Sequence, residues 1–292
     1  MLPQACISKC ACSGSEERVR NLRLGIPARI FATMHRILPA RMGDGMWRLW
    51  YQRLAKTKAW GELNYMNYGF TDADQPVLDE KEESDRLFIQ LYHMNIRDIE
   101  LEGKQVLEVG SGRGGGADWI ARTYSPSTLT AVDYSAKAVQ LCERLYAGQD
   151  NLDFVEGDAM ALPFDDASFD VIYNVESSHC YSDMGAFVSE AHRVLRSGGL
   201  FAWTDFRDES GMREVHALFL DTGFVIVEQS DVTAEVLQAL DEMSDDKQAR
   251  IKNGTSLAIR RSFETFAGVR GTPVYESFRN GSLEYHRYLL AK

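Results

Sequence analysis

Long apolar runs and cysteines are scarce in this sequence, and both absences limit what the protein can be. The 292 residues contain no stretch of about 18 uncharged apolar residues, so the sequence predicts no transmembrane helix. The five cysteines are too few, and odd in number, for a disulfide scaffold. Cys142 and Cys180 stand alone and are expected to be free thiols of a reducing compartment. Because the start of the chain also lacks the apolar run of a secretory signal, we expect a cytoplasmic protein. An Arg-rich start is an alternative sign of an organelle transit peptide, although Glu16 and Glu17 count against it.

Candidate metal ligands are sparse as well. Cys6, Cys10 and Cys12 lie close together, but no second ligand pair stands near them. We therefore expect an irregular start to the chain and no metal site. No internal repeat or low-complexity segment occurs, and 45% hydrophobic residues exclude a mainly disordered chain.

Acidic residues are almost absent from one part of the chain, although the whole carries a net charge of −11. Residues 18–58 contain ten Lys or Arg and one acid, a net charge of +9. Residues 1–17 carry −1, which leaves −19 on residues 59–292. The basic segment indicates an anionic partner such as a membrane surface. The alternative is that it packs against the acidic part of its own subunit or of a neighbouring subunit in a homo-oligomer. The acidic remainder argues against a nucleic-acid substrate.

Two amphipathic helices are predicted within the basic segment. Their apolar residues recur at helical spacing: Ile30, Met34, Ile37 and Leu38 in the first, and Trp47, Trp50, Tyr51 and Leu54 in the second. Tryptophan beside arginine suits a membrane interface, but packing on the protein core is the more common fate of such helices. We expect residues 1–60 to form a basic helical extension and residues 61–292 to form the catalytic domain.

From residue 104 onward, predicted strands alternate with predicted helices. The strands are expected at 105–109, 128–133, 152–156, 169–174, 200–205, 224–230 and 283–290. Helices are expected at 117–123, 135–145 and 184–195, the last ended by Ser197-Gly198-Gly199. This alternation predicts an α/β fold with a doubly wound, mainly parallel, seven-stranded sheet. Residues 232–281 are expected to form a helical insert that caps the active site before the last strand.

A glycine-rich turn follows the first strand of this core. Glycine permits positive φ and lets the backbone approach a ligand closely, and ligands of open α/β sheets bind beyond the carboxyl ends of the strands. Gly110, Gly112 and Gly115 also satisfy the dinucleotide pattern G-x-G-x-x-G, and a purely structural turn is a further alternative. Asp133, at the end of the second strand, can accept hydrogen bonds from a ribose or can cap the following helix.

The end of the third strand distinguishes these nucleotide ligands. Asp158 lies in Gly157-Asp158-Ala159, followed by Leu162-Pro163-Phe164 and Phe169-Asp170-Val171. An acid at this point can accept a hydrogen bond from an adenine amino group. Ordinary dehydrogenases do not carry this run.

In combination, these motifs resemble class I S-adenosylmethionine-dependent methyltransferases. Residues from about 45 to 292 further resemble the phthiotriol/phenolphthiotriol dimycocerosate methyltransferases, through Leu91-Tyr92-His93, Gly112–Ala117 and Val175–Tyr181. The resemblance implies a Rossmann-like methyltransferase, with S-adenosylmethionine as cofactor and S-adenosylhomocysteine as product. It implies methyl transfer to a hydroxyl of a hydrophobic small molecule, such as a lipid or polyketide. C-methylation of a sterol- or terpenoid-type acceptor and a non-methylating cyclase remain alternatives.

The resemblance also assigns cofactor-binding residues. The glycine loop is expected along the methionine part, the end of the second strand at the ribose, and the end of the third strand at the adenine. An aromatic run before the core is expected to close over the cofactor. The predicted cofactor residues are Tyr65, Tyr68, Glu108, Gly110, Ser111, Gly112, Gly114, Asp133, Tyr134, Ser135, Asp158, Ala159, Asn174 and Val175.

His179, after the fourth strand, is the candidate general base for O-methylation. An alcohol is a weak nucleophile, and an imidazole with an ordinary pKa of about 6.5 can take its proton near neutral pH. A positioning or structural histidine is the alternative. Glu176 lies three residues away and is expected to orient or assist His179. The run Asp241–Lys247 is expected to be a solvated helix face.

Overall fold

The computed structural model describes residues 64–254 and 257–292. All of these residues belong to one compact unit. The predicted extension 1–60, with its two helices and Cys6, Cys10 and Cys12, lies outside the described residues. Among those described, no helix is long and apolar enough to cross a membrane.

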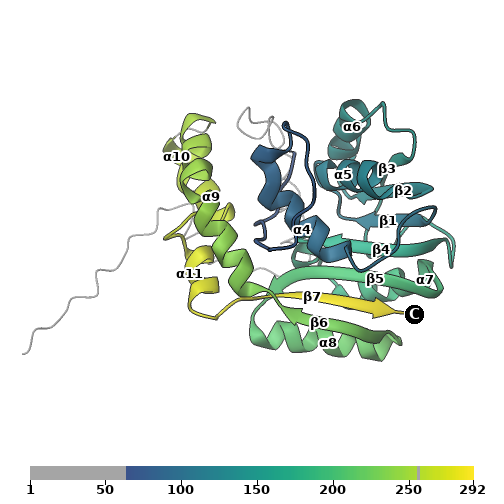
Figure 1. The fold of residues 1–292 in the computed structure, drawn as a ribbon. Coiled ribbons are helices and arrows are strands. Elements are labelled where there is room, and N and C mark those ends of the chain that lie inside the picture. Colours follow the sequence, from purple (N-terminus) through teal and green to yellow (C-terminus); the bar gives the residue numbers. More distant parts are fainter. Residues whose placement is uncertain (1–63, 255–256) are drawn as a thin grey trace, which may run out of the picture. The chain divides into compact units, whose positions relative to one another are not determined.

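A seven-stranded sheet with strand order β3-β2-β1-β4-β5-β7-β6 forms the centre of this unit (Figure 1). The strands pair in parallel except β7, which is antiparallel to both β5 and β6. Their bounds are β1 Gln105–Val109, β2 Thr128–Asp133, β3 Leu152–Glu156, β4 Phe169–Val175, β5 Leu195–Arg207, β6 Val225–Asp231 and β7 Glu284–Ala291. The predicted doubly wound α/β fold is therefore confirmed.

Helices cover both faces of the sheet, because neighbouring strand residues point to opposite sides. On one face, Val106 lies in a core with residues of α4 (Arg86–Ile96) and α5 (Gly115–Tyr124). On the other face, Leu107 lies in a core with residues of α7 (Met184–Val194) and α8 (Glu209–Thr222). Helix α6 (Ala136–Leu145) connects β2 to β3.

The helical insertion predicted for residues 232–281 lies between β6 and β7. It consists of α9 (Thr233–Gly254), α10 (Leu257–Phe266) and α11 (Pro273–Arg279) (Figure 1). Val236 and Leu240 of α9 are buried in the same core as Tyr68. Gly69 approaches α9 so closely that a Cβ atom would lie 3.4 Å from the Ala239 side chain. The insertion therefore packs on the segment that precedes the core of the fold.

Some elements differ from the sequence prediction. Strand β5 runs through Ser197-Gly198-Gly199, where an interruption was expected, because Gly198 (φ 76°) lies where the register with β4 shifts. Helix α4 was not predicted, although Arg86, Gln90 and His93 recur at helical spacing; eight of its eleven residues are buried. Helix α8 was also not predicted, although Asp208 before it and Gly223 after it are standard end signals.

The cap of helix α8 provides a stability test. The Asp208 side chain accepts hydrogen bonds from the Gly211 N–H (2.7 Å) and the Ser210 hydroxyl (2.9 Å). We expect D208A to lower the free energy of unfolding by about 1 kcal/mol, because an N–H of the first turn loses its acceptor. D208N, which keeps an acceptor oxygen, is the control. Urea unfolding measures both, and equal midpoints for D208A and wild type would contradict the role of this cap.

Candidate active site

Backbone hydrogen bonds of the glycine turn connect the carboxyl end of β1 to that of β2. The N–H groups of Gly110 and Ser111 donate to the Val132 carbonyl oxygen, at 2.8 and 3.0 Å. The Gly112 N–H donates to Asp133 Oδ2 at 2.8 Å. Gly110 and Gly112 have φ angles of 84° and 55°, which L side chains rarely adopt. The turn thus presents its backbone at the strand ends, where α/β folds bind ligands.

Asp133 and its neighbours continue this edge of the sheet. The second oxygen of Asp133, Oδ1, accepts a hydrogen bond from the Ser135 N–H (2.8 Å). Ser135 caps helix α6 by accepting from the Ala138 N–H, so the capping role considered for Asp133 belongs to Ser135. Burial raises the pKa of Asp133, while the N–H groups of Ser135 and Gly112 oppose the rise.

The predicted adenine-binding residues lie next to Asp133. The Gly157 N–H donates to the Asp133 carbonyl oxygen at 3.1 Å, which joins the ends of β2 and β3. Asp158 Oδ1 accepts from the Met160 N–H at 2.9 Å, and Ala159 is buried. Tyr134 is half exposed. The residues predicted for the ribose and for the adenine are therefore neighbours at one edge.

Three buried polar atoms near the glycine turn have no hydrogen-bond partner within the described part of the chain: Glu108 Oε2, Ser111 Oγ and Asn174 Oδ1. Buried polar atoms are normally satisfied, so each of them requires an explanation. Asn174, at the end of β4, donates to the Val109 carbonyl oxygen at 2.7 Å, which directs its amide to the end of β1. Carboxyl, hydroxyl and amide oxygens fit the ammonium and carboxylate groups of a bound amino acid, including the methionine part of S-adenosylmethionine.

Glu108 is fully buried on β1. Burial raises its pKa to about 8, the nearby Tyr173 and Tyr92 hydroxyls oppose the rise, and the charge of Asp133 adds to it. The native state therefore retains a proton that the unfolded chain releases above a pH of about 4.3. The contribution of Glu108 to the free energy of unfolding must then fall as pH rises from about 4.3 to about 8.

The substitution E108Q tests this linkage. It should remove a pH dependence of about 1 kcal/mol per pH unit between pH 5 and 8. Chemical unfolding without cofactor, at several pH values, measures the difference between wild type and E108Q. E143Q, on the exposed surface of α6, should keep the wild-type slope. Equal slopes for wild type and E108Q would show that Glu108 is ionised in the folded protein.

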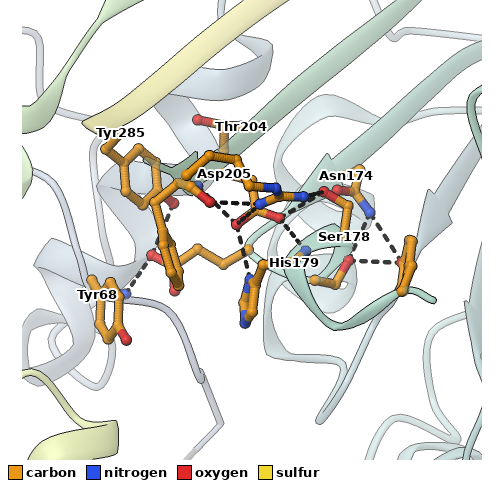
Figure 2. Close-up of polar contacts among 12 residues, drawn as sticks. Tyr68, Asn174, Ser178, His179, Thr204, Asp205 and Tyr285 are labelled. Atoms are coloured by element: carbon orange, nitrogen blue, oxygen red, sulfur yellow. Dashed lines mark hydrogen bonds and ion pairs between the residues drawn. The ribbon is translucent and has the colours of Figure 1, made fainter. Parts of the chain in front are cut away.

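His179 and Asp205 form a hydrogen-bonded pair where β4 and β5 end. The Val175–Thr204 register of these parallel strands places the two following segments side by side. Nδ1 of His179 lies 2.9 Å from Asp205 Oδ1, and the His179 backbone N–H donates to Oδ2 at 2.9 Å. Figure 2 shows Asp205 between His179 and Ser178, with Tyr68 and Tyr285 on one side and Asn174 on the other.

Asp205 is completely buried but surrounded by donors. Its carboxylate accepts from the Ser178 hydroxyl (2.7 Å) and the Phe206 N–H (2.8 Å), and lies 3.3 Å from Arg207 Nη1. Burial alone would raise the pKa of Asp205, but the charges of His179 and Arg207 hold it well below the usual range. An ionised carboxylate only accepts, so Nδ1 of His179 carries the hydrogen and Nε2 remains for a ligand.

The pKa of His179 is raised well above its ordinary value. Burial lowers it, but neighbouring Cys180 and Asp205 outweigh burial and favour the charged imidazolium. The His179 ring packs on the Phe206 ring, with 4.5 Å between centroids. Asp205 therefore both orients the imidazole and makes it a stronger base than an isolated histidine.

Glu176 bonds to other groups than His179. Its Oε1 accepts from the Tyr68 backbone N–H and the Tyr285 hydroxyl, both at 2.8 Å. Burial raises the pKa of Glu176 to about 7, opposed by these two donors. Its φ angle of 42° is rare for a residue with a side chain, and such strain is concentrated at functional sites.

Aromatic rings surround this carboxyl group and the imidazole. The Tyr68 ring lies 5.4 Å from the Phe206 ring and 5.6 Å from the Phe278 ring of α11. Tyr65 stacks on Phe88 of α4, with 6.2 Å between centroids. Tyr65 and Tyr68 are both buried. The His179 side of the site is therefore largely apolar apart from its few titratable groups.

Comparison with known proteins decides the family. Residues 107–203 match the family model of a methyltransferase domain. Over 270 residues the chain is 35% identical to a phthiotriol/phenolphthiotriol dimycocerosates methyltransferase from Mycobacterium tuberculosis, covering 90% of this chain and 99% of that protein. The chain belongs to this methyltransferase family. It is an S-adenosylmethionine-dependent methyltransferase, as the combined glycine-loop, Asp133 and Asp158 motifs predicted.

Two further proteins are similar to this methyltransferase. A fatty-acid O-methyltransferase from Mycolicibacterium smegmatis is 36% identical over 236 residues, covering 79% of this chain and 84% of that protein. The structure of a geranyl diphosphate C-methyltransferase from Streptomyces coelicolor, with S-adenosyl-L-homocysteine, superposes with a TM-score of 0.63. That superposition covers 87% of this chain and 98% of the other at 18% identity, which shows the fold alone.

The methyltransferase brings together most of the residues predicted for its site. The predicted cofactor residues lie along the ends of β1 to β4, except Tyr65 and Tyr68, which precede α4, and His179 follows β4. Asp205 and Tyr285 were missed, although both bond to the predicted pair His179 and Glu176. Asp205 could have been predicted as a site residue, because it is an acid at the end of the predicted strand 200–205. No local pattern marks Tyr285, which comes from β7.

Proposed function

We propose that this methyltransferase transfers the methyl group of S-adenosylmethionine to a hydroxyl group of a lipid-like small molecule. The single observation that carries the proposal is the His179–Asp205 pair beside the glycine turn. The glycine turn lies close to the segment that carries His179. A Cβ atom on Gly110 would overlap the hydroxyl of Ser177, two residues before His179. Such a pair is a general base positioned where an acceptor oxygen must lose its proton.

The lipid-like character of the acceptor rests on two observations. The aromatic rings of Tyr68, Phe206 and Phe278 offer an apolar surface next to His179. The names of the relatives describe a phthiotriol and a fatty acid as the molecules they methylate. A long apolar chain would gain its binding free energy by removing this surface from water.

The chemistry assigns a separate task to each residue. Bound S-adenosylmethionine supplies a methyl group activated by a sulfonium. Nε2 of His179 accepts the proton of the acceptor hydroxyl as the new oxygen–carbon bond forms. Asp205 holds Nδ1–H in place and stabilises the imidazolium that results. Holding the acceptor oxygen in line with the methyl group lowers the barrier further, because it removes the entropy cost of bringing the two together.

We assign the cofactor contacts by the same proposal. Glu108, Ser111 and Asn174 would hold the methionine part with the oxygens that lack partners. The ribose would lie at Asp133, with Tyr134 and Ser135 beside it, and the adenine at Asp158 and Ala159. Gly110, Gly112 and Gly114 would give the backbone its close approach, and Val175, Tyr65 and Tyr68 would border the sulfonium.

A capped acceptor provides the test of the proposed function. The full-length protein is incubated with methyl-labelled S-adenosylmethionine and a long-chain alcohol, or with the methyl ether of the same alcohol. We expect label in the organic extract from the alcohol and none from the ether, because the ether has no hydroxyl to methylate. Label from both would indicate C-methylation. No transfer to a panel of hydroxylated lipids, despite cofactor binding, would contradict the proposal.

A further inference from the structure

Lys247 of α9 is partly buried against the aromatic rings of the site. We expected the run Asp241–Lys247 to be a solvated helix face, and for Lys247 this is wrong. Its Nζ atom lies 5.2 Å from the ring centroid of Phe88 and 6.0 Å from that of Tyr68, and donates to the Ala267 carbonyl oxygen at 3.2 Å. Aromatic faces attract a cation and partly compensate for the water it has lost. Burial lowers the pKa of Lys247 to about 8, opposed by Glu176.

A continuous row of rings connects this ammonium group to the proposed base. Nζ stands over Tyr68, the Tyr68 ring lies 5.4 Å from that of Phe206, and Phe206 packs on His179. The backbone of Tyr68 also bonds to Glu176. Lys247 therefore belongs to the same aromatic wall as His179, on the side formed by the helical insertion.

The acids near this wall are already bonded to other groups. Asp205 accepts from Ser178, His179 and Phe206, and Glu176 accepts from Tyr68 and Tyr285. Within the described residues, no carboxylate lies within ion-pair distance of Nζ. An ammonium group has three N–H donors, and the Ala267 carbonyl uses one of them. The remaining donors and the positive charge of the partly buried Lys247 can therefore bind an anionic oxygen from outside the chain.

We propose that Lys247 is an acceptor-binding residue, and that the acceptor is a hydroxylated long-chain acid whose carboxylate binds this ammonium group. Its hydroxyl would then face His179 along the aromatic wall. The inference rests on the proposed function and adds the acidic group to the acceptor. Lys247 would determine specificity, because a neutral lipid of the same length cannot replace the carboxylate.

The test compares hydroxy acids with their primary amides, which have nearly the same shape but no charge. Hydroxylated C12 acids with the hydroxyl at different distances from the carboxylate serve as probes. For the best acid we expect kcat/KM to exceed that of its amide by about tenfold or more, the usual contribution of a charged hydrogen bond. K247M should reduce this ratio to about one, mainly through KM, and K247R should retain most of it. The loss of kcat/KM in K247M should be larger for the acid than for the amide, because only the acid loses a charged hydrogen bond.

One further measurement distinguishes a failure of this inference from a failure of the proposed function. Calorimetry with saturating S-adenosylhomocysteine compares acid and amide binding without any transfer, so the preference can be measured even if no acceptor is methylated. Equal use and equal binding of acid and amide by wild type would overturn the inference and leave the proposed function standing. An equal loss for both probes in K247M, or a methyl ester as product, would also overturn it.

Discussion

The H179A protein is expected to lose about 10²- to 10⁴-fold in kcat, the usual contribution of a general base, while its affinity for S-adenosylmethionine stays near wild type. Alanine removes the nitrogen that takes the acceptor proton but leaves the glycine turn and Asp133 in place. Initial rates with a hydroxylated acceptor and calorimetry with the cofactor measure the two quantities. H216A is the matched control, because His216 lies on α8 and its ring faces the Tyr288 hydroxyl at 3.3 Å. Wild-type kcat in H179A would exclude His179 as the base.

The pH dependence of the same reaction tests the part played by Asp205. Only the neutral imidazole accepts a proton, and the pKa of His179 is raised well above 6.5. The rate should therefore increase with pH beyond neutrality, until His179 is deprotonated. D205N removes the charge that favours the imidazolium. The rise of the rate with pH should therefore occur at lower pH in D205N, and the maximal rate should fall. If the rate of D205N rose over the same pH range as that of the wild type, a group other than His179 would control the rate.

The G110A protein is expected to bind S-adenosylmethionine roughly 100-fold more weakly, or about 3 kcal/mol. Gly110 has φ 84°, which costs an alanine about 1–2 kcal/mol of strain. A Cβ atom there would also overlap the Ser177 hydroxyl and lie 2.8 Å from that of Tyr181. The turn must shift, and the backbone that faces the cofactor shifts with it. Calorimetry with the cofactor and thermal unfolding measure the loss.

A second glycine separates strain from displacement of the turn. Gly103 has φ 71°, and nothing lies within 4 Å of a Cβ atom placed there. G103A should lose about 1 kcal/mol of stability through strain alone and keep its cofactor affinity. Equal affinities for G103A and G110A would contradict a cofactor site at the glycine turn.

Much of the sheet could be predicted from local sequence. The bounds of β1, β2 and β3 were predicted to the residue, because each is a short apolar run ended by glycine or by an acid and a turn. Ser135 shows the limit of such patterns, since it was included in the predicted helix but is the cap before α6. Helix α4 was missed although Arg86, Gln90 and His93 recur at helical spacing.

The site was predictable only where its residues follow strand ends. His179 and Asp133 both occupy such positions, and their motifs are contiguous in the chain. Asp205, Tyr285 and Lys247 come from β5, β7 and α9, and the fold brings them to the predicted residues over long separations. Lys247 shows this most clearly, because its neighbours along α9 are charged and indicate a solvated face.

The carbon NMR spectrum of the product is the most direct test of methyl transfer to oxygen. The full-length protein is given S-adenosylmethionine labelled with carbon-13 in the methyl group, together with a hydroxylated long-chain acceptor. The labelled carbon should resonate in the methoxy region, couple to the carbon that carried the hydroxyl, and be absent with H179A. A labelled carbon in the aliphatic methyl region, or a methoxy signal of wild-type intensity with H179A, would contradict O-methylation by the His179–Asp205 pair.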